Sequence, residues 1–82
     1  MAGMSRSIED AILSLLAERE PGKSIDPSEA ARAVDADGWR RLLPQVRATA
    51  VGLARQGRLA ILRHGKPVDP DAFKGVYRLR LP

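Results

Sequence analysis

Residues 39–57 constrain the fold more than any other stretch, because their apolar positions repeat with the period of one α-helix. Residues placed about 100° apart around a helix axis separate here into an apolar face and a basic face. The apolar face predicts contact with the core. On the basic face arginines lie with Pro44 and Val51, and no carboxylate occurs in residues 38–68 to neutralise them. The apolar face consists of Trp39, Leu42, Leu43, Val46, Ala50, Leu53 and Ala54, and the arginines are Arg40, Arg41, Arg47 and Arg55.

Pro44 interrupts this helical pattern, since proline lacks a backbone N–H and crowds the preceding turn. Two arrangements fit: one helix that kinks at Pro44, or a short helical turn over residues 39–43 followed by a main helix. We favour the second, with the main helix over residues 44–56, because proline is preferred at the first helical position and Gly57 is a good terminator. In that arrangement Arg47 and Arg55 are the arginines that remain on one helix.

Two further helices are predicted before this one. The first begins at Ser7, whose hydroxyl would cap free amides with Asp10 at the third helical position, and it ends near Arg19. Its apolar residues recur at helical spacing, which predicts a structural helix that packs against the core. Residues 1–6 precede it as a flexible N-terminus, and residues 7–82 form a single domain.

Residues 26–29 predict the start of the second helix. Asp26 is the expected cap, Pro27 occupies the first helical position, and Glu29 completes a capping box. This helix ends at residue 34 or 35. Residues 35–38 then form a turn in which either Asp35 or Asp37 can cap the next helix.

Three short stretches have the character of strands. Residues 23–25 can pair at a sheet edge through Ile25. In residues 58–63, side chains expected in the core alternate with others, and Leu62 is the exception to this pattern. In residues 76–81 successive side chains point to opposite faces, one with Tyr77 and the other with two arginines. The last two stretches are expected to pair as an antiparallel hairpin, with a turn at 64–67 and a loop at 68–75. The order predicts an α+β winged helix-turn-helix with three helices and a small antiparallel β-hairpin wing.

Several residues also carry a resemblance to a known family. The pattern of Pro27-Ser28-Glu29, Ala31-Arg32, Trp39-Arg40, Val46-Arg47-Ala48, Leu53, Gly57, Arg63, Gly65, Val68-Asp69-Pro70, Gly75 and Tyr77-Arg78-Leu79 resembles a small bacterial family of domains of unknown function. The resemblance covers roughly residues 8–81, and Val76-Tyr77 departs from the more proline-like pair expected there. It implies a winged-helix-like fold and no particular activity.

Charge is distributed unevenly along the chain. Residues 1–37 carry a net charge of −4, and residues 38–82 carry +8, within a total of +4. A chain polarised in this way can present a basic surface to a polyanion while its acidic part faces away. The distribution therefore favours nucleic acid as a partner.

Composition excludes several other classes. No apolar run is long enough to span a membrane, and no signal-peptide core occurs at the start, so we expect a cytoplasmic protein without a membrane partner. The chain has no cysteine and one histidine, so we expect neither a metal site nor a cofactor. Asp35, Asp37, Asp69 and Asp71 lie in turn sequences, where carboxylates bond nearby amides, so we expect no enzymatic activity.

The leading functional hypothesis is binding to duplex DNA through the helix at 44–56 and the wing at 63–75. Arginines would contact phosphates or base edges, polar side chains near the groove would assist, and the wing would reach an adjacent phosphate or the minor groove. The candidate residues are Arg40, Arg41, Gln45, Arg47, Thr49, Arg55, Arg63, His64 and Lys66, with Ala48 also near the groove. If His64 does not contact nucleic acid, we expect it to be an exposed turn residue. We assign Trp39, Phe73 and Tyr77 to the core.

The alternative hypothesis is a protein-interaction or self-association module. In that case Val51, Leu62 or the wing would dock a partner or another copy of the chain. Aromatic residues make up 4% of the chain, and this scarcity disfavours a large dedicated interface because aromatic side chains anchor many of them.

Overall fold

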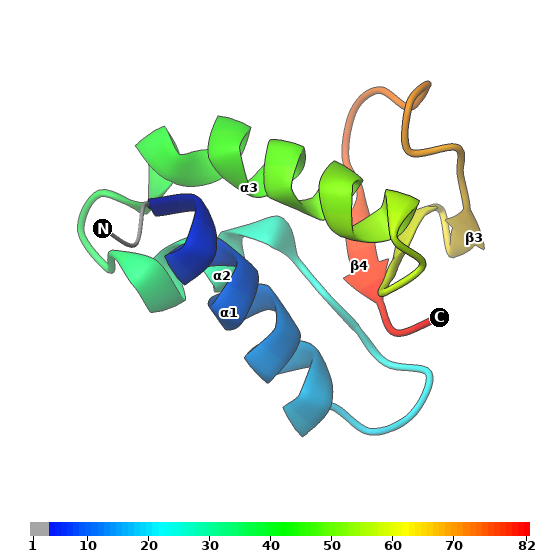
Figure 1. The fold of residues 1–82 in the computed structure, drawn as a ribbon, viewed down its shortest axis with the longest axis horizontal. Helices are drawn as coiled ribbons and strands as arrows, with labels where there is room; N and C mark the ends of the chain where they lie inside the picture. The colour runs from blue at the N-terminus through cyan, green and yellow to red at the C-terminus, as the bar shows by residue number, and fades with distance from the viewer. Residues whose placement is uncertain (1–3) are drawn as a thin grey trace.

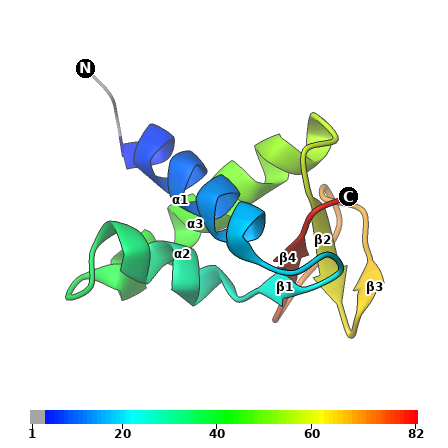
Figure 2. The same cartoon turned by 90° about the horizontal axis from the view of Figure 1, so that it is seen from below.

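The computed structural model describes residues 4–82, with side chains from residue 7 onward. Its elements follow in the order α1 (Met4–Glu18), β1 (Ser24–Ile25), α2 (Pro27–Val34), α3 (Trp39–Arg55), β2 (Ala60–Arg63), β3 (Lys66–Pro67) and β4 (Arg78–Arg80). The helices pack together, and an antiparallel sheet lies at one end of them (Figure 1). Figure 2 shows the same division from below, with α1 and α2 on one side and the four strands on the other. The fold class is therefore α+β, as predicted.

Helix α1 begins earlier than predicted. Its first residue is Met4, so Ser7 lies inside the helix and the prediction that Ser7 caps it is wrong. Methionine and arginine are good helix formers, and nothing in residues 4–6 opposes helix. Of the predicted flexible N-terminus, residues 1–3 lie outside the described residues. The helix buries Ile8, Ile12 and Leu16 completely or nearly so, which is the predicted apolar stripe.

Helix α2 begins at the predicted capping box. The carboxylate of Asp26 accepts a hydrogen bond from the Ser28 amide at 2.9 Å, and the Asp26 amide donates to Glu29 Oε2 at 2.8 Å. Pro27 stands at the start of the helix, where its missing N–H costs nothing. The helix ends at Val34, as expected.

Helix α3 is continuous from Trp39 to Arg55, with Pro44 inside it. The prediction of a separate turn over 39–43 and a helix beginning at Pro44 is wrong. Proline removes one backbone hydrogen bond, to the Arg40 carbonyl, whereas Leu42 and Val46 on either side of it are both buried. Their burial against the same core holds the helical axis through the proline.

The start of α3 also differs from expectation. Its cap position is Gly38, and no side chain caps it. Asp35 instead stabilises the preceding turn, because its Oδ1 accepts hydrogen bonds from the amides of Asp37 and Gly38. The C-terminus is as predicted: Gly57 has a φ of 74°, and the Arg58 amide bonds the Leu53 carbonyl at 3.0 Å. This is the hydrogen-bond pattern of a Schellman motif.

The sheet has the order β1-β4-β2-β3. The predicted pairing of the last two strand stretches is confirmed, with Ile61 opposite Leu79, and β1 pairs with β4 through Ile25. The prediction of a simple turn at 64–67 is wrong, because Lys66–Pro67 form an additional strand against β2. His64 and Gly65 connect them with φ values of 53° and 79°, and consecutive positive φ values are the requirement of a type I′ hairpin turn.

The core lies where the three helices meet the inner face of the sheet. Phe73 and Tyr77 are buried in it, and Trp39 is half-buried at its margin, which confirms their assignment. Leu62 is also buried, so it cannot serve as an exposed docking residue as the interaction hypothesis assumed. Among the described residues, no helix is long and apolar enough to cross a membrane.

Candidate functional site

The outward side of α3 carries the candidate residues of this helix. Pro44, Gln45 and Ala48 are exposed along it, with Arg40 and Arg41 at one end and Arg55 at the other. Thr49 and Arg47 lie at its margins and are half-buried. The centre of this side is therefore uncharged, and both of its ends are basic. Continuity through Pro44 places Arg40 and Arg41 on the same helix as Arg47 and Arg55.

Arg47 contacts other residues of the protein and does not point freely into solvent. Its Nη2 donates a hydrogen bond of 2.6 Å to the Phe73 carbonyl, and its guanidinium carbon lies 3.9 Å from the centre of the Phe73 ring. Phe73 in turn packs edge-on against Tyr77, with ring centres 5.2 Å apart. Arg47 therefore fastens the chain that follows the hairpin against α3.

Two other arginines of α3 are paired with carboxylates. Arg55 forms an ion pair with Asp71, and its Nε lies 2.8 Å from Asp71 Oδ1. Arg41 reaches Asp35 at 3.2 Å. The expectation that nothing neutralises the arginine face is wrong at these positions, because folding brings in carboxylates from outside residues 38–68. Both pairs are largely exposed to solvent, so each adds little to stability.

Arg40 takes part in a stack on the indole of Trp39. The guanidinium carbons of Arg40 and Arg32 lie 4.6 Å and 4.4 Å from the centre of the Trp39 ring.

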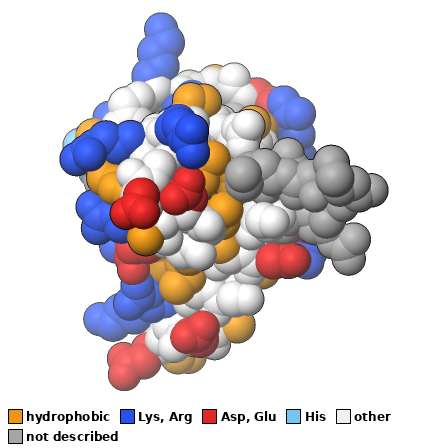
Figure 3. All heavy atoms as spheres, turned by 90° about the vertical axis from the view of Figure 1, so that its left-hand side faces the viewer, with side chains coloured by type: hydrophobic (Ala, Val, Ile, Leu, Met, Phe, Trp, Pro, Cys, Tyr) orange, Lys and Arg blue, Asp and Glu red, His pale blue; other side chains and the backbone are white. Residues whose placement is uncertain are grey.

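On the face shown in Figure 3, acidic, basic and apolar side chains lie side by side over the part that grey atoms do not cover. Both signs of charge are therefore present on this face.

The remaining candidates lie on the β2–β3 hairpin. His64 and Lys66 are exposed at its tip. Arg63 is half-buried, and its guanidinium lies so close to Gly75 that a Cβ added there would be 2.6 Å from Nη1. The β2–β3 hairpin leads directly into the segment that contacts Arg47 and Arg55. Arg63 of the hairpin also lies against Gly75 near the end of that segment. We call residues 63–77 the wing segment.

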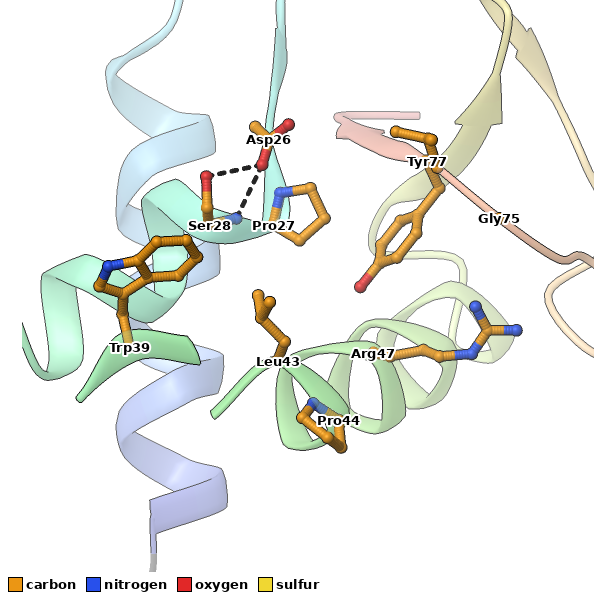
Figure 4. A pocket seen from close by; sticks show the side chains of 10 residues that line it. Asp26, Pro27, Ser28, Trp39, Leu43, Pro44, Arg47, Gly75 and Tyr77 are labelled. Atoms are coloured by element: carbon orange, nitrogen blue, oxygen red, sulfur yellow. Dashed lines mark hydrogen bonds between the residues drawn. The ribbon is translucent and has the colours of Figure 1, made fainter. Parts of the chain in front are cut away.

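A hollow that the sequence did not predict lies between α2, α3 and the wing segment. Its volume is about 630 Å³. Figure 4 shows Tyr77 and Arg47 on one side of it and Trp39 on the other, with Pro27 above Leu43 between them. Its lining consists of Asp26, Pro27, Ser28, Trp39, Leu43, Pro44, Arg47, Gly75, Val76 and Tyr77. No periodicity reveals such a site, because three separate segments supply its walls.

Two ionisable groups of the hollow have shifted pKa values. Burial raises the pKa of the Tyr77 hydroxyl to about 12, so the group stays protonated at neutral pH. At Asp26, burial acts to raise the pKa, but the hydrogen bonds from Ser28 and the nearby Arg78 outweigh it and lower the pKa below 3.8. The hollow therefore holds a neutral hydroxyl and a carboxylate.

Acidic side chains do not gather into a metal centre. No group of three or more potential metal ligands occurs within the part of the chain that the structure describes. The aspartates at 35 and 69 each accept hydrogen bonds from amides of their own turns, as the turn interpretation predicted.

The family described as "Protein of unknown function (DUF3253)" matches residues 5–82, and the chain belongs to this family. The match confirms the resemblance to a family of unknown function. The chain matches no curated protein.

Proposed function

We propose that this member of the family is a non-enzymatic winged-helix module that binds duplex DNA. Residues 44–56 of α3 would enter the major groove, and residues 63–75 of the wing segment would lie on the neighbouring backbone. A cytoplasmic location is part of the proposal. The observation that carries it is the attachment of the wing segment to α3 by Arg47, which makes the two elements one contact surface.

The order of elements supports this proposal. Helices α2 and α3 are joined by the short turn at 35–38 and are followed by β2 and the wing segment, while β1 and β2 flank β4. This is the arrangement of a helix-turn-helix with a wing, in which the second helix of the pair reads the groove.

The proposed roles follow the exposure of each side chain. Gln45 and Thr49 face the groove, Arg40 and Arg41 anchor backbone phosphates, and Arg63, His64 and Lys66 contact an adjacent phosphate or the minor groove. Arg55 and Arg41 can exchange their exposed carboxylate partners for phosphates at little cost. Arg47 acts by positioning the wing segment.

The test is a titration with unrelated duplexes at several salt concentrations. Affinity should fall as salt rises, because each phosphate contact releases condensed counterions. Absence of binding at low salt, or binding that salt does not weaken, would contradict the proposal.

A pair of double variants then locates the surface. Arg40→Gln with Lys66→Gln removes two exposed charges from the proposed surface, and Arg19→Gln with Lys23→Gln removes two from the α1–β1 side. The first pair should weaken binding more and reduce the salt slope by about 2, since each lost phosphate contact lowers it by about 1. Equal losses in both pairs would indicate diffuse charge and no defined reading helix.

A second candidate function is a protein-interaction or self-association module. Val76 on the wing segment is a large apolar side chain that is 80% exposed, and such residues are common at contact surfaces. Sedimentation velocity over a concentration series tests self-association. A molecule that stays monomeric at all concentrations would remove that form of the alternative.

A further inference from the structure

The hollow beside α3 is apolar over most of its wall. Pro27, Leu43 and Pro44 lie along it, the wing segment adds Val76, and the aromatic rings of Trp39 and Tyr77 border it. Its volume of about 630 Å³ falls within the range of roughly 300–1,000 Å³ that small-molecule sites occupy. A hollow of this size and lining favours a small apolar molecule with one or a few rings.

A few polar groups border it. The Tyr77 hydroxyl points into the hollow, and Figure 4 marks no hydrogen bond between it and the other residues drawn there. The Arg47 guanidinium lies on the same side, with one of its nitrogens bonded to the Phe73 carbonyl. Asp26 lies beside Pro27 at the border of the hollow, and its carboxylate is engaged by Ser28. Hydrogen-bond donors and positive charge therefore lie on the side of Tyr77 and Arg47.

We infer that the hollow binds a small planar apolar molecule that carries a carboxylate. Its ring lies against Pro27, Leu43 and Trp39, and its carboxylate faces the Tyr77 hydroxyl and Arg47. The site is a property of the folded chain and does not require nucleic acid.

An extended peptide suits the same walls less well. It would bring backbone N–H and C=O groups along its whole length, and the apolar wall of Pro27, Leu43 and Pro44 offers them no side-chain partners. A molecule with one polar group at one end matches the distribution of donors better.

A bound molecule would touch three elements at once. The wall includes the start of α2, the N-terminal half of α3 and the end of the wing segment. Occupancy would therefore fasten the wing segment to the two helices and raise the thermal stability of the protein by mass action.

The test uses naphthalene-2-carboxylate and the matched alcohol naphthalene-2-methanol, without nucleic acid. Amide and indole NMR shifts of the wild-type protein are followed during each titration, and the single tryptophan reports directly on the hollow. We expect saturable shifts at Trp39, Leu43 and Val76 with the carboxylate and about tenfold weaker binding of the alcohol, as expected for hydrogen bonds to a charged group.

Three variants locate the binding. Tyr77→Phe removes the hydroxyl that points into the hollow, and it should weaken carboxylate binding by about tenfold while leaving alcohol binding nearly unchanged. Val76→Glu places a negative charge at the rim of the hollow and should also weaken carboxylate binding. Leu81→Glu is its matched control, because Leu81 is 43% exposed and lies outside this hollow.

Four results would overturn the inference. They are no saturable shift with either compound, equal affinity for the acid and the alcohol, equal effects of Val76→Glu and Leu81→Glu, and shifts at the hollow with a proline-rich peptide but not with the carboxylate.

Discussion

Asp26 takes part in both the start of α2 and the contact of α2 with the sheet. Its carboxylate accepts a hydrogen bond from the Ser28 amide and lies 3.8 Å from a guanidinium nitrogen of Arg78 on β4, and its own amide donates to the Glu29 carboxylate. It thereby joins the start of a helix to the sheet, and its carboxylate borders the hollow.

Replacement of this cap should lower stability measurably. Asp26→Ala is expected to reduce the free energy of unfolding by about 1 kcal/mol, because the first amides of α2 lose their acceptor. Asp26→Asn is the matched control, since asparagine caps helices nearly as well. Urea unfolding followed by far-UV circular dichroism measures both variants. Equal losses would show that charge matters more than the cap.

The same carboxylate makes the free energy of unfolding depend on pH. The pKa of Asp26 lies below 3.8 in the folded protein despite burial, and the amide of Gly38 is the largest cause that lowers the pKa of Asp35 below the same value. A folded-state pKa below the unfolded value means that stability is complete above pH 3.8 and is lost as pH falls through the folded pKa values. Unfolding in urea between pH 5 and pH 2 should show this decline, and Asp26→Asn should flatten it. An unchanged slope in that variant would assign the decline to other carboxylates.

Helix α3 contains two residues that oppose helix, Pro44 and Gly52. It nevertheless runs unbroken from Trp39 to Arg55, with Leu42, Val46, Ala50 and Leu53 buried along one side. Packing of that side therefore outweighs the local preferences, as is usual for helices in folded proteins.

Gly52 offers a direct measure of that local cost. A Cβ added there meets no atom within 4 Å, and its φ is not in the left-handed region. Gly52→Ala is expected to raise the free energy of unfolding by about 0.5–1 kcal/mol, because alanine loses less backbone entropy on folding. Ala48→Gly, on the exposed side of the same helix, should produce a loss of similar size. A destabilising Gly52→Ala in thermal unfolding would mean that the helix is strained at that turn.

The wing segment is joined to the helices through Phe73 and Tyr77, which are buried in the common core, and through two arginines of α3. Arg47 makes the more central arginine contact, since it joins the Phe73 carbonyl and the faces of Phe73 and Tyr77. Arg55 adds an exposed ion pair with Asp71 farther along the helix. Loss of the first contact should release the wing segment, whereas loss of the second should not.

This difference can be measured by hydrogen exchange. Arg47→Ala is expected to lower stability by about 1.5–3 kcal/mol, the range for a hydrogen bond to a charged group, and to speed amide exchange in residues 68–77. Arg55→Ala should cost less than about 1 kcal/mol and leave that exchange nearly unchanged. Similar exchange in both variants would show that the wing segment is held by its apolar contacts alone.

Local features of this chain could be predicted because their partners are near in sequence. The capping box of Asp26 and the termination at Gly57 depend on bonds within a few residues, and the strands were visible from the alternation of neighbouring side chains. The structure confirms each of them. The strand at Lys66–Pro67 was missed because two residues carry too little pattern, although the His64-Gly65 pair ahead of it marks a tight turn.

Features that depend on distant partners required the folded chain. Arg47 and the Phe73 carbonyl are 26 residues apart, and Arg55 and Asp71 are 16 apart, so a pattern read along one helix assigns both arginines to an unpaired face. The continuity of α3 through Pro44 was decided in the same way, by burial against α1 and α2. The hollow has its walls on three elements and exists because the wing segment folds back onto α3. Local hydrogen bonding thus determines where α2 begins and α3 ends, and packing between elements determines which side chains remain available to bind a partner.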